Sequence, residues 1–78
     1  MSISFIHFDV RPIIAASREP FPEIMAKVES LKKDQGLEIV APFLPSPLIE
    51  RLGAVGFKTR FEHASDGSWS VFFWKDPP

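Results

Sequence analysis

The sequence predicts an α+β two-layer sandwich in which two helices cover one face of a four-stranded sheet. Three observations lead to this expectation. Apolar residues recur at helical spacing in two segments, 21–33 and 46–56. Four other segments are rich in β-branched and aromatic residues, as strands usually are. The segments follow one another in the order βαβαββ. A chain of 78 residues has room for one core, so residues 1–78 are expected to form a single domain.

The N-terminal half predicts a strand, a loop and a helix. Residues 3–10 are rich in β-branched and aromatic side chains, and Pro12 follows them. Residues 11–20 are expected to form a loop. Residues 21–33 carry an apolar stripe at helical spacing, with proline in the first turn and lysines at the end, so they predict a helix. The turn-forming run Asp34-Gln35-Gly36 is expected to end it.

The next elements are a short strand over 37–41 and a second helix. Ser46, followed by a proline, is the expected N-cap of this helix. Its apolar residues lie one turn apart, and Gly53 or Gly56 is expected to close it.

The C-terminal third predicts a β-hairpin formed by segments 57–64 and 69–75. Ser65-Asp66-Gly67 between them has the composition of a hairpin turn. The first two strands should be parallel, because a strand–helix–strand crossover is right-handed. Two helices cover only one sheet face, so the other face should be open.

The expected core combines the helical stripes with strand residues of matching alternation. Its predicted members are Ile6, Phe8, Val10, Ile24, Met25, Val28, Leu31, Ile39, Leu48, Leu52, Phe57, Phe61, Val71 and Phe73.

Composition and charge exclude several classes of function. The chain has no cysteine, which removes thiolate nucleophiles, disulfides and zinc–thiolate sites. Its formal net charge of −1 disfavours general nucleic-acid binding. The N-terminus lacks the features of a signal peptide, and no run is long enough to span a bilayer. A cytoplasmic protein that does not bind membranes is therefore expected.

The chain resembles a known family at the start of its first helix. Phe8-Asp9-Val10-Arg11 and then Glu19-Pro20-Phe21-Pro22 are similar to the opening of TusA/SirA-type sulfur carriers. The closest resemblance is to the TusA-related family named domain of unknown function 2249. It implies a mixed sheet in the order 1-2-4-3 with strand four antiparallel. Sulfur carriers have cysteine where this chain has Glu19, so sulfur relay is excluded on chemical grounds.

Two helix starts and the loops before them are expected to meet at the carboxyl edge of the parallel strands, where α/β proteins usually bind ligands. This edge is the candidate site for a small anionic ligand. Alternatively, Glu19 and Glu23 already satisfy the helix dipoles and the arginines are solvated. The candidate ligand-binding residues are Arg11, Ser17, Arg18, Glu19, Phe43 and Ser46.

Neither a catalytic site nor a metal site is expected. His7 and Asp9 share one face of the first strand, but His63 lies on the opposite edge of the implied sheet. Glu19 lacks a partner group for acid–base catalysis. The sequence therefore predicts no enzyme activity and no cofactor.

The strongest indication of function is that strands one and four carry large apolar residues on both faces. One set must pack on the helices, and the other would lie on the open face, as interface residues do. A register slip would exchange the faces and expose Trp69, Val71 and Phe73 instead. The predicted interface residues are Phe5, Lys58, Arg60, Phe72 and Trp74.

The functional prediction is therefore a non-catalytic binding module that acts with a protein partner or with a second copy of itself. Two alternatives stay open. One is an accessory domain that binds a small anionic ligand near Glu19. The other is RNA binding, since the C-terminal domain of translation initiation factor three has a similar fold, although basic residues are few here.

Overall fold

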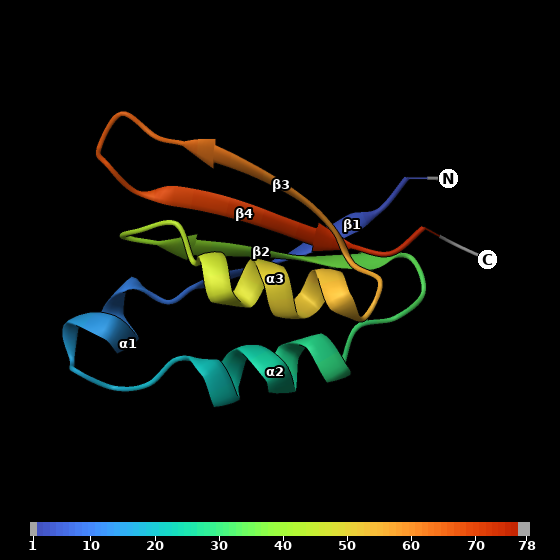
Figure 1. Ribbon diagram of the computed structural model, residues 1–78, viewed down its shortest axis with the longest axis horizontal. Coiled ribbons are helices and arrows are strands. Elements are labelled where there is room, and N and C mark those ends of the chain that lie inside the picture. Colours follow the sequence, from blue (N-terminus) through green and yellow to red (C-terminus); the bar gives the residue numbers. More distant parts are fainter. Residues whose placement is uncertain (1, 77–78) are drawn as a thin grey trace.

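The computed structural model describes residues 2–76, which form a four-stranded sheet and three helices (Figure 1). The strands are β1 (Ser4–Asp9), β2 (Gln35–Ala41), β3 (Lys58–His63) and β4 (Trp69–Trp74). The helices are α1 (Arg11–Ala15), α2 (Phe21–Glu29) and α3 (Ser46–Ala54).

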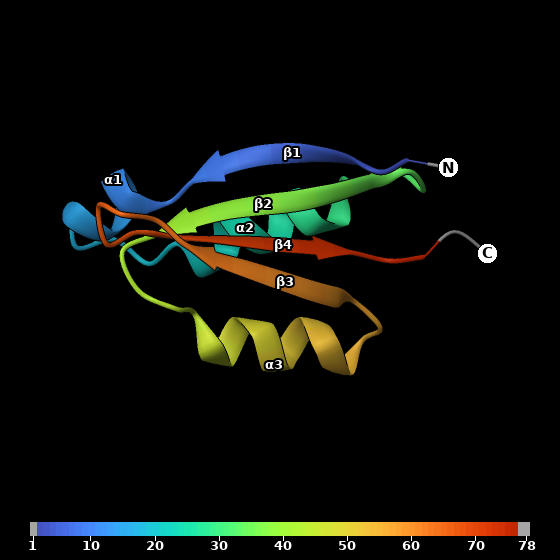
Figure 2. The ribbon, with the colours of Figure 1, turned by 90° about the horizontal axis from the view of Figure 1, so that it is seen from above.

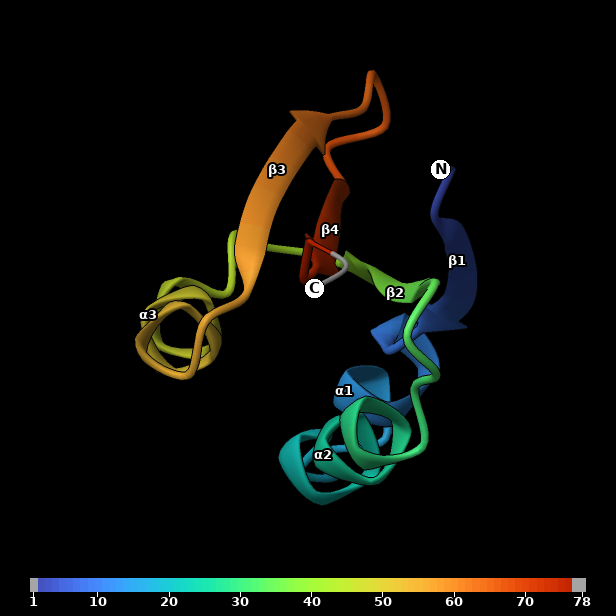
Figure 3. The ribbon, with the colours of Figure 1, turned by 90° about the vertical axis from the view of Figure 1, so that its right-hand side faces the viewer.

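The sheet has the predicted order β1-β2-β4-β3. β1 and β2 are parallel, and β4 is antiparallel to both of its neighbours. Figure 3, an end view, shows all three helices on one side of the sheet. The predicted fold class is confirmed, and the other sheet face carries no helix.

Helix α1 lies where the sequence predicts a loop. It begins directly after β1, and Pro12 occupies its first turn, where a missing N–H costs nothing. Ala15 and Ala16 favour helix, and Ile14 packs against the core. The prediction was wrong because one turn is too short to show an apolar stripe.

Two helix boundaries differ from the prediction. α2 ends at Glu29, not at residue 33, and the Ser30 hydroxyl donates to the Lys27 carbonyl at 2.8 Å. Such side-chain bonds compete with helix continuation. α3 has Pro45 as its N-cap, and Ser46, the predicted cap, is its first residue and makes no capping bond.

Gly36 was predicted to end a helix, but it lies inside β2. Gly56 takes the predicted role after α3, with a φ of +101°. In the hairpin turn, Gly67 also has positive φ, and Ala64 N–H donates to the Ser68 carbonyl.

The core lies between the helices and the face of the sheet that they cover. Its buried residues are Val10, Ile24, Leu37, Ile39, Ala41, Leu48, Leu52, Val71 and Phe73. Others from the predicted core, among them Met25 and Leu31, are half-buried and pack against it.

The predicted core was wrong at Ile6 and Phe61, which are 37% and 50% exposed. Both are on the helix-covered face but on the edge strands β1 and β3, beyond the area that the helices cover. Leu37, Val40 and Ala41 are buried although the sequence did not single them out. They belong to β2, which has a strand on each side.

Candidate functional site

The uncovered face of the sheet, here called the open face, is defined by strand register. Val71 and Phe73 are buried against the helices, so their neighbours along β4 point the other way. The open-face residues are Phe5, His7, Asp9, Gly36, Glu38, Val40, Lys58, Arg60, Glu62, Ser70, Phe72 and Trp74. The structure thus places all five predicted interface residues on one face; that they form an interface stays a prediction.

Three of these residues form an aromatic cluster at one end of the open face: Phe5, Phe72 and Trp74. The ring centroid of Phe5 lies 5.2 Å from that of Phe72 and 6.1 Å from that of Trp74, and both pairs are edge-to-face. Phe5 is 37% exposed, and the other two are half-buried. Edge-to-face pairs of this kind add about 0.5–1.5 kcal/mol beyond area burial, so the cluster is held in place before any partner binds.

Gly36 makes this cluster possible. A Cβ atom at this position would lie 2.6 Å from Cε1 of Phe5 and 2.6 Å from the carbonyl oxygen of Phe73. Only glycine lets the Phe5 ring lie directly on β2 and reach across it to β4. A glycine inside a strand often marks a close approach of this kind, and this is the signal that could have identified Gly36.

Basic side chains from β3 border the aromatic cluster. The Arg60 guanidinium carbon lies 4.9 Å from the centroid of the Phe72 ring, a cation–π contact. The distance from Arg60 Nη2 to Glu62 Oε2 is 3.9 Å, near the upper limit for an ion pair. Lys58 pairs with Asp76.

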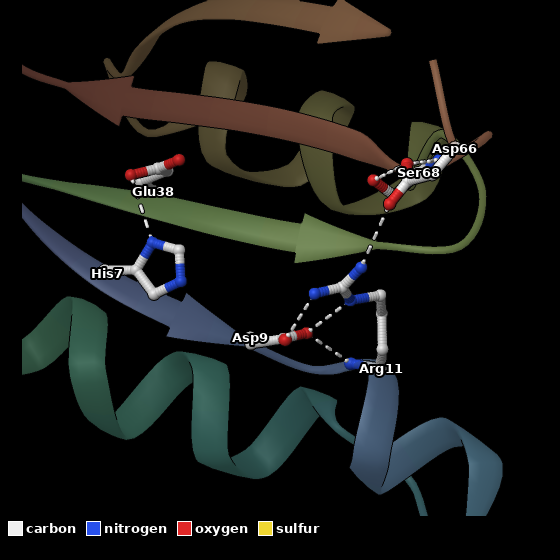
Figure 4. Close-up of polar contacts among 6 residues, drawn as sticks. All are labelled: His7, Asp9, Arg11, Glu38, Asp66 and Ser68. Atoms are coloured by element: carbon white, nitrogen blue, oxygen red, sulfur yellow. Dashed lines mark hydrogen bonds and ion pairs between the residues drawn. The ribbon is translucent and has the colours of Figure 1, made fainter. Parts of the chain in front are cut away.

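The other end of the open face is polar (Figure 4). Asp9 accepts hydrogen bonds from the backbone N–H of Arg11 and from its Nε and Nη2, at 2.8–3.0 Å. Arg11 Nη1 lies 3.6 Å from Asp66, which belongs to the β3–β4 turn. Arg11 therefore joins the end of β1 to the tip of the hairpin, a role that its sequence neighbourhood did not suggest.

The two acids of this group titrate below their ordinary range. The side-chain hydrogen bond from Arg11 is the main reason that the pKa of Asp9 is lowered. The hydroxyl of Ser68 donates to Asp66 at 2.6 Å and lowers the pKa of Asp66.

Replacement of Asp9 by Asn should lower stability in a pH-dependent way. Because the folded-state pKa of Asp9 is depressed, its contribution is present above the unfolded-state pKa and is lost as pH falls through the folded value. We expect urea denaturation to show the Asp9→Asn variant as less stable at neutral pH, with the difference narrowing as the pH falls below 3.8, the ordinary pKa of an aspartate. A difference that does not change with pH would contradict this role.

The two histidines lie on different faces. His7 Nδ1 lies 3.2 Å from Glu38 Oε1 on the open face (Figure 4). His63 stacks on Trp69 on the other face, with centroids 4.2 Å apart and planes at 5°. Within residues 2–76, no group of three His, Cys, Asp or Glu residues is arranged to hold a metal ion.

The predicted ligand edge contains a groove of about 360 Å³ between the starts of α2 and α3. Three of the six candidate residues, Arg18, Glu19 and Phe43, line it among apolar neighbours. Ser17 and Ser46 are exposed but do not line the groove, and Arg11 is held at the open face.

Contacts in this groove argue against an anion there. The Glu19 carboxylate accepts a hydrogen bond from the backbone N–H of Phe21 at 3.0 Å. Pro22 in the first turn of α2 and Pro47 in the first turn of α3 have no backbone N–H, so each helix start has one donor fewer. Arg18 contacts Glu23 at 3.2 Å. The anionic-ligand alternative stays a prediction, but the groups that it needs already have partners.

The comparisons with known proteins give one match. A family model described as "Uncharacterized conserved protein (DUF2249)" matches residues 7–75. No curated protein and no solved structure matches the chain. No helix within residues 2–76 has both the length and the apolar character to cross a bilayer. The resemblance to domain of unknown function 2249 is confirmed, while the relation to the sulfur carriers stays a prediction; the chain belongs to this family, the uncharacterized conserved proteins of DUF2249.

Proposed function

We propose that this protein is a small, non-catalytic binding module that holds a partner protein against the open face of its sheet. The observation that carries the proposal is the aromatic cluster of Phe5, Phe72 and Trp74 on a sheet face without helices. Aromatic residues and arginine are the residue types most enriched at the energetic centres of protein interfaces.

The geometry of the cluster supports binding in two ways. Its rings still expose apolar area, and removal of such area from water contributes about 25 cal/mol per Å². The rings are also held in place by their mutual edge-to-face contacts and by Gly36 beneath Phe5. A preorganised surface loses less conformational entropy on association, so more of the burial energy is available as affinity.

The border of the cluster indicates the chemistry of the partner. Arg60 is held over Phe72, while its pairing with Glu62 is long, so its guanidinium can donate hydrogen bonds to a partner carboxylate. Toward β1 the face carries Glu38 and Asp9, each with its own basic neighbour. We therefore expect a partner that places apolar side chains over the aromatic cluster and an acidic group beside β3.

The double variant Phe72→Ser/Trp74→Gln tests this proposal in affinity capture from cell extract. We expect wild-type protein to recover a partner, and the double variant to recover less than about a tenth as much, since loss of two anchors of roughly 1–2 kcal/mol each lowers affinity more than tenfold. Phe43→Ser is the matched control, because Phe43 is 49% exposed but lies in the groove near α3. It should recover the partner as wild type does.

Circular dichroism shows whether each variant is folded. Equal recovery by a folded double variant would contradict the proposal. Unfolding of the double variant would contradict it too, since these aromatics would then be core residues. Recovery of nucleic acid with steep salt dependence would favour the RNA alternative.

A further inference from the structure

The free edge of β1 differs from the other edge of the sheet. The strand order makes β1 and β3 the two edge strands. Figure 2 shows no described helix outside β1, and β3 is also exposed along most of its length, since Figure 1 shows α3 below β2 and well away from β3. Exposed strand edges carry unpaired backbone groups and readily pair with other chains unless they are covered or charged.

The side chains distinguish the two edges. β3 carries Lys58, Arg60 and Glu62, the kind of charges that keep an edge strand from pairing. β1 carries the run Phe5-Ile6-His7-Phe8, which has no lysine, proline or bulge. Phe5 and Ile6 are each 37% exposed and lie on opposite faces of this strand. β1 therefore has an unprotected edge with apolar side chains on both faces.

The backbone of β1 shows which groups are available. Ser4 N–H donates to Asp34 and Val10 N–H donates to Val40, so the even-numbered residues direct their backbone groups toward β2. Successive residues of a strand direct these groups to opposite sides. Phe5, His7 and Asp9 therefore direct their N–H and C=O groups toward the free edge.

We propose that β1 pairs with β1 of a second copy in an antiparallel, two-fold symmetric arrangement centred on Ile6. Two identical strands related by a two-fold axis perpendicular to the sheet are necessarily antiparallel, and such isologous contacts close after two copies. In this register Phe5 of each copy exchanges backbone hydrogen bonds with His7 of the other. The exposed Ile6 side chains meet across the axis and bury one another.

The alternative register, centred on His7, has poorer side-chain pairing. It would place two polar imidazoles opposite each other and the carboxylate of Asp9 beside the apolar Phe5 ring. Neither pair buries apolar area against apolar area, as the two Ile6 side chains do. The Ile6-centred register places His7 beside the Phe5 ring instead, and it leaves the contact of His7 with Glu38 in place.

The pairing should be weak and should extend the open face. A strand edge of six residues is about 20 Å long, so it buries far less than the roughly 800 Å² per partner of a standard interface. We expect dissociation constants in the micromolar range or above.

Because Phe5 and His7 lie opposite each other, both open faces are on the same side of one continuous sheet. The dimer would thus present two aromatic clusters together, although its formation does not depend on partner binding.

Cysteine cross-linking tests the register directly, because the chain has no cysteine of its own. In non-hydrogen-bonded antiparallel pairs the opposite Cα atoms are about 4.5 Å apart, within the range of about 4.4–6.8 Å that a disulfide spans. We expect Ile6→Cys to form a covalent dimer on mild oxidation. His7→Cys, whose thiols would lie too far apart, and Phe61→Cys, an exposed position on the opposite edge, should cross-link at least tenfold more slowly. Equal rates for the three variants, or fastest cross-linking at position 7, would overturn the proposal.

Sedimentation equilibrium tests the dimer without cross-linking. The mass of the wild-type protein should rise from one copy toward two as its concentration increases through the micromolar range, whereas Ile6→Lys should remain monomeric. Phe61→Lys is the matched control, an exposed apolar residue on the same sheet face but at the β3 edge, and it should dimerise as wild type does. Wild-type protein that stays monomeric up to about 1 mM would overturn the proposal.

The two proposals can fail separately. Phe72→Ser/Trp74→Gln leaves β1 unchanged, so this variant should lose partner capture but still dimerise. Ile6→Lys lies on the helix-covered face, so it should lose the dimer but still bind the partner at its open face.

Discussion

Phe73→Ala is expected to destabilise the protein by about 3–5 kcal/mol, the usual cost of removing a fully buried phenylalanine side chain. Phe73 has no exposed surface and packs in the centre of the core beside Leu37, its neighbour on β2. Chemical denaturation measures the change. A loss of this size would leave a 78-residue domain close to unfolding at room temperature.

The neighbouring substitution Phe72→Ala is the matched control. It removes the same side-chain atoms from the adjacent residue of β4. The Phe72 ring lies on the open face and is half-buried. Its loss should cost about 1–2 kcal/mol, mainly from the contact with Phe5 and the cation–π contact with Arg60. A cost for Phe72→Ala as large as that for Phe73→Ala would show that the faces of β4 are assigned the wrong way round.

Gly36→Ala is also expected to be strongly destabilising, by about 1–3 kcal/mol, the usual cost of overpacking. The new Cβ would lie 2.6 Å from the carbonyl oxygen of Phe73, which the strand ladder holds in place, and 2.6 Å from the Phe5 ring. The ring can move but the carbonyl cannot move without disturbing the pairing of β2 with β4. Urea denaturation gives the loss of stability, and the NMR shifts of Phe5, Phe72 and Trp74 report disruption of the cluster.

Gly53→Ala is the control for this substitution. Gly53 lies in α3, and an added Cβ would meet no atom within 4 Å. The change should stabilise the protein by about 0.5–1 kcal/mol, because alanine favours helix over glycine. If Gly53→Ala stabilises the protein as expected but Gly36→Ala leaves its stability unchanged, the close approach of Phe5 to β2 would be contradicted.

Much of the fold could be predicted because its main elements have a clear period. The apolar stripe of α2 identifies that helix and its buried side, the β-branched and aromatic composition of β4 identifies a strand, and the crossover rule makes β1 and β2 parallel. The sheet order came from the resemblance to a family. Helix α1 could not be predicted from periodicity, because five residues show less than two turns of any pattern.

The site was predictable in its aromatic part only. Alternation along β1 and β4 grouped Phe5, Phe72 and Trp74, and the strand register of the structure shows that this set lies on the open face. The Arg11–Asp66 contact joins residues far apart in sequence, and it depends on how the hairpin folds back over the end of β2. Exposure of Ile6 and Phe61 depends on how far the helices extend under the edge strands, which no local pattern encodes.

Fluorescence of two single-tryptophan variants tests the central claim most directly. Trp69→Phe leaves only Trp74, on the open face, and Trp74→Phe leaves only Trp69, on the helix-covered face. Each variant is titrated with the protein that wild type recovers in capture, and quenching by acrylamide is followed. We predict that binding shields Trp74 from the quencher and leaves Trp69 unchanged. Shielding of Trp69 with no change at Trp74 would contradict binding at the open face.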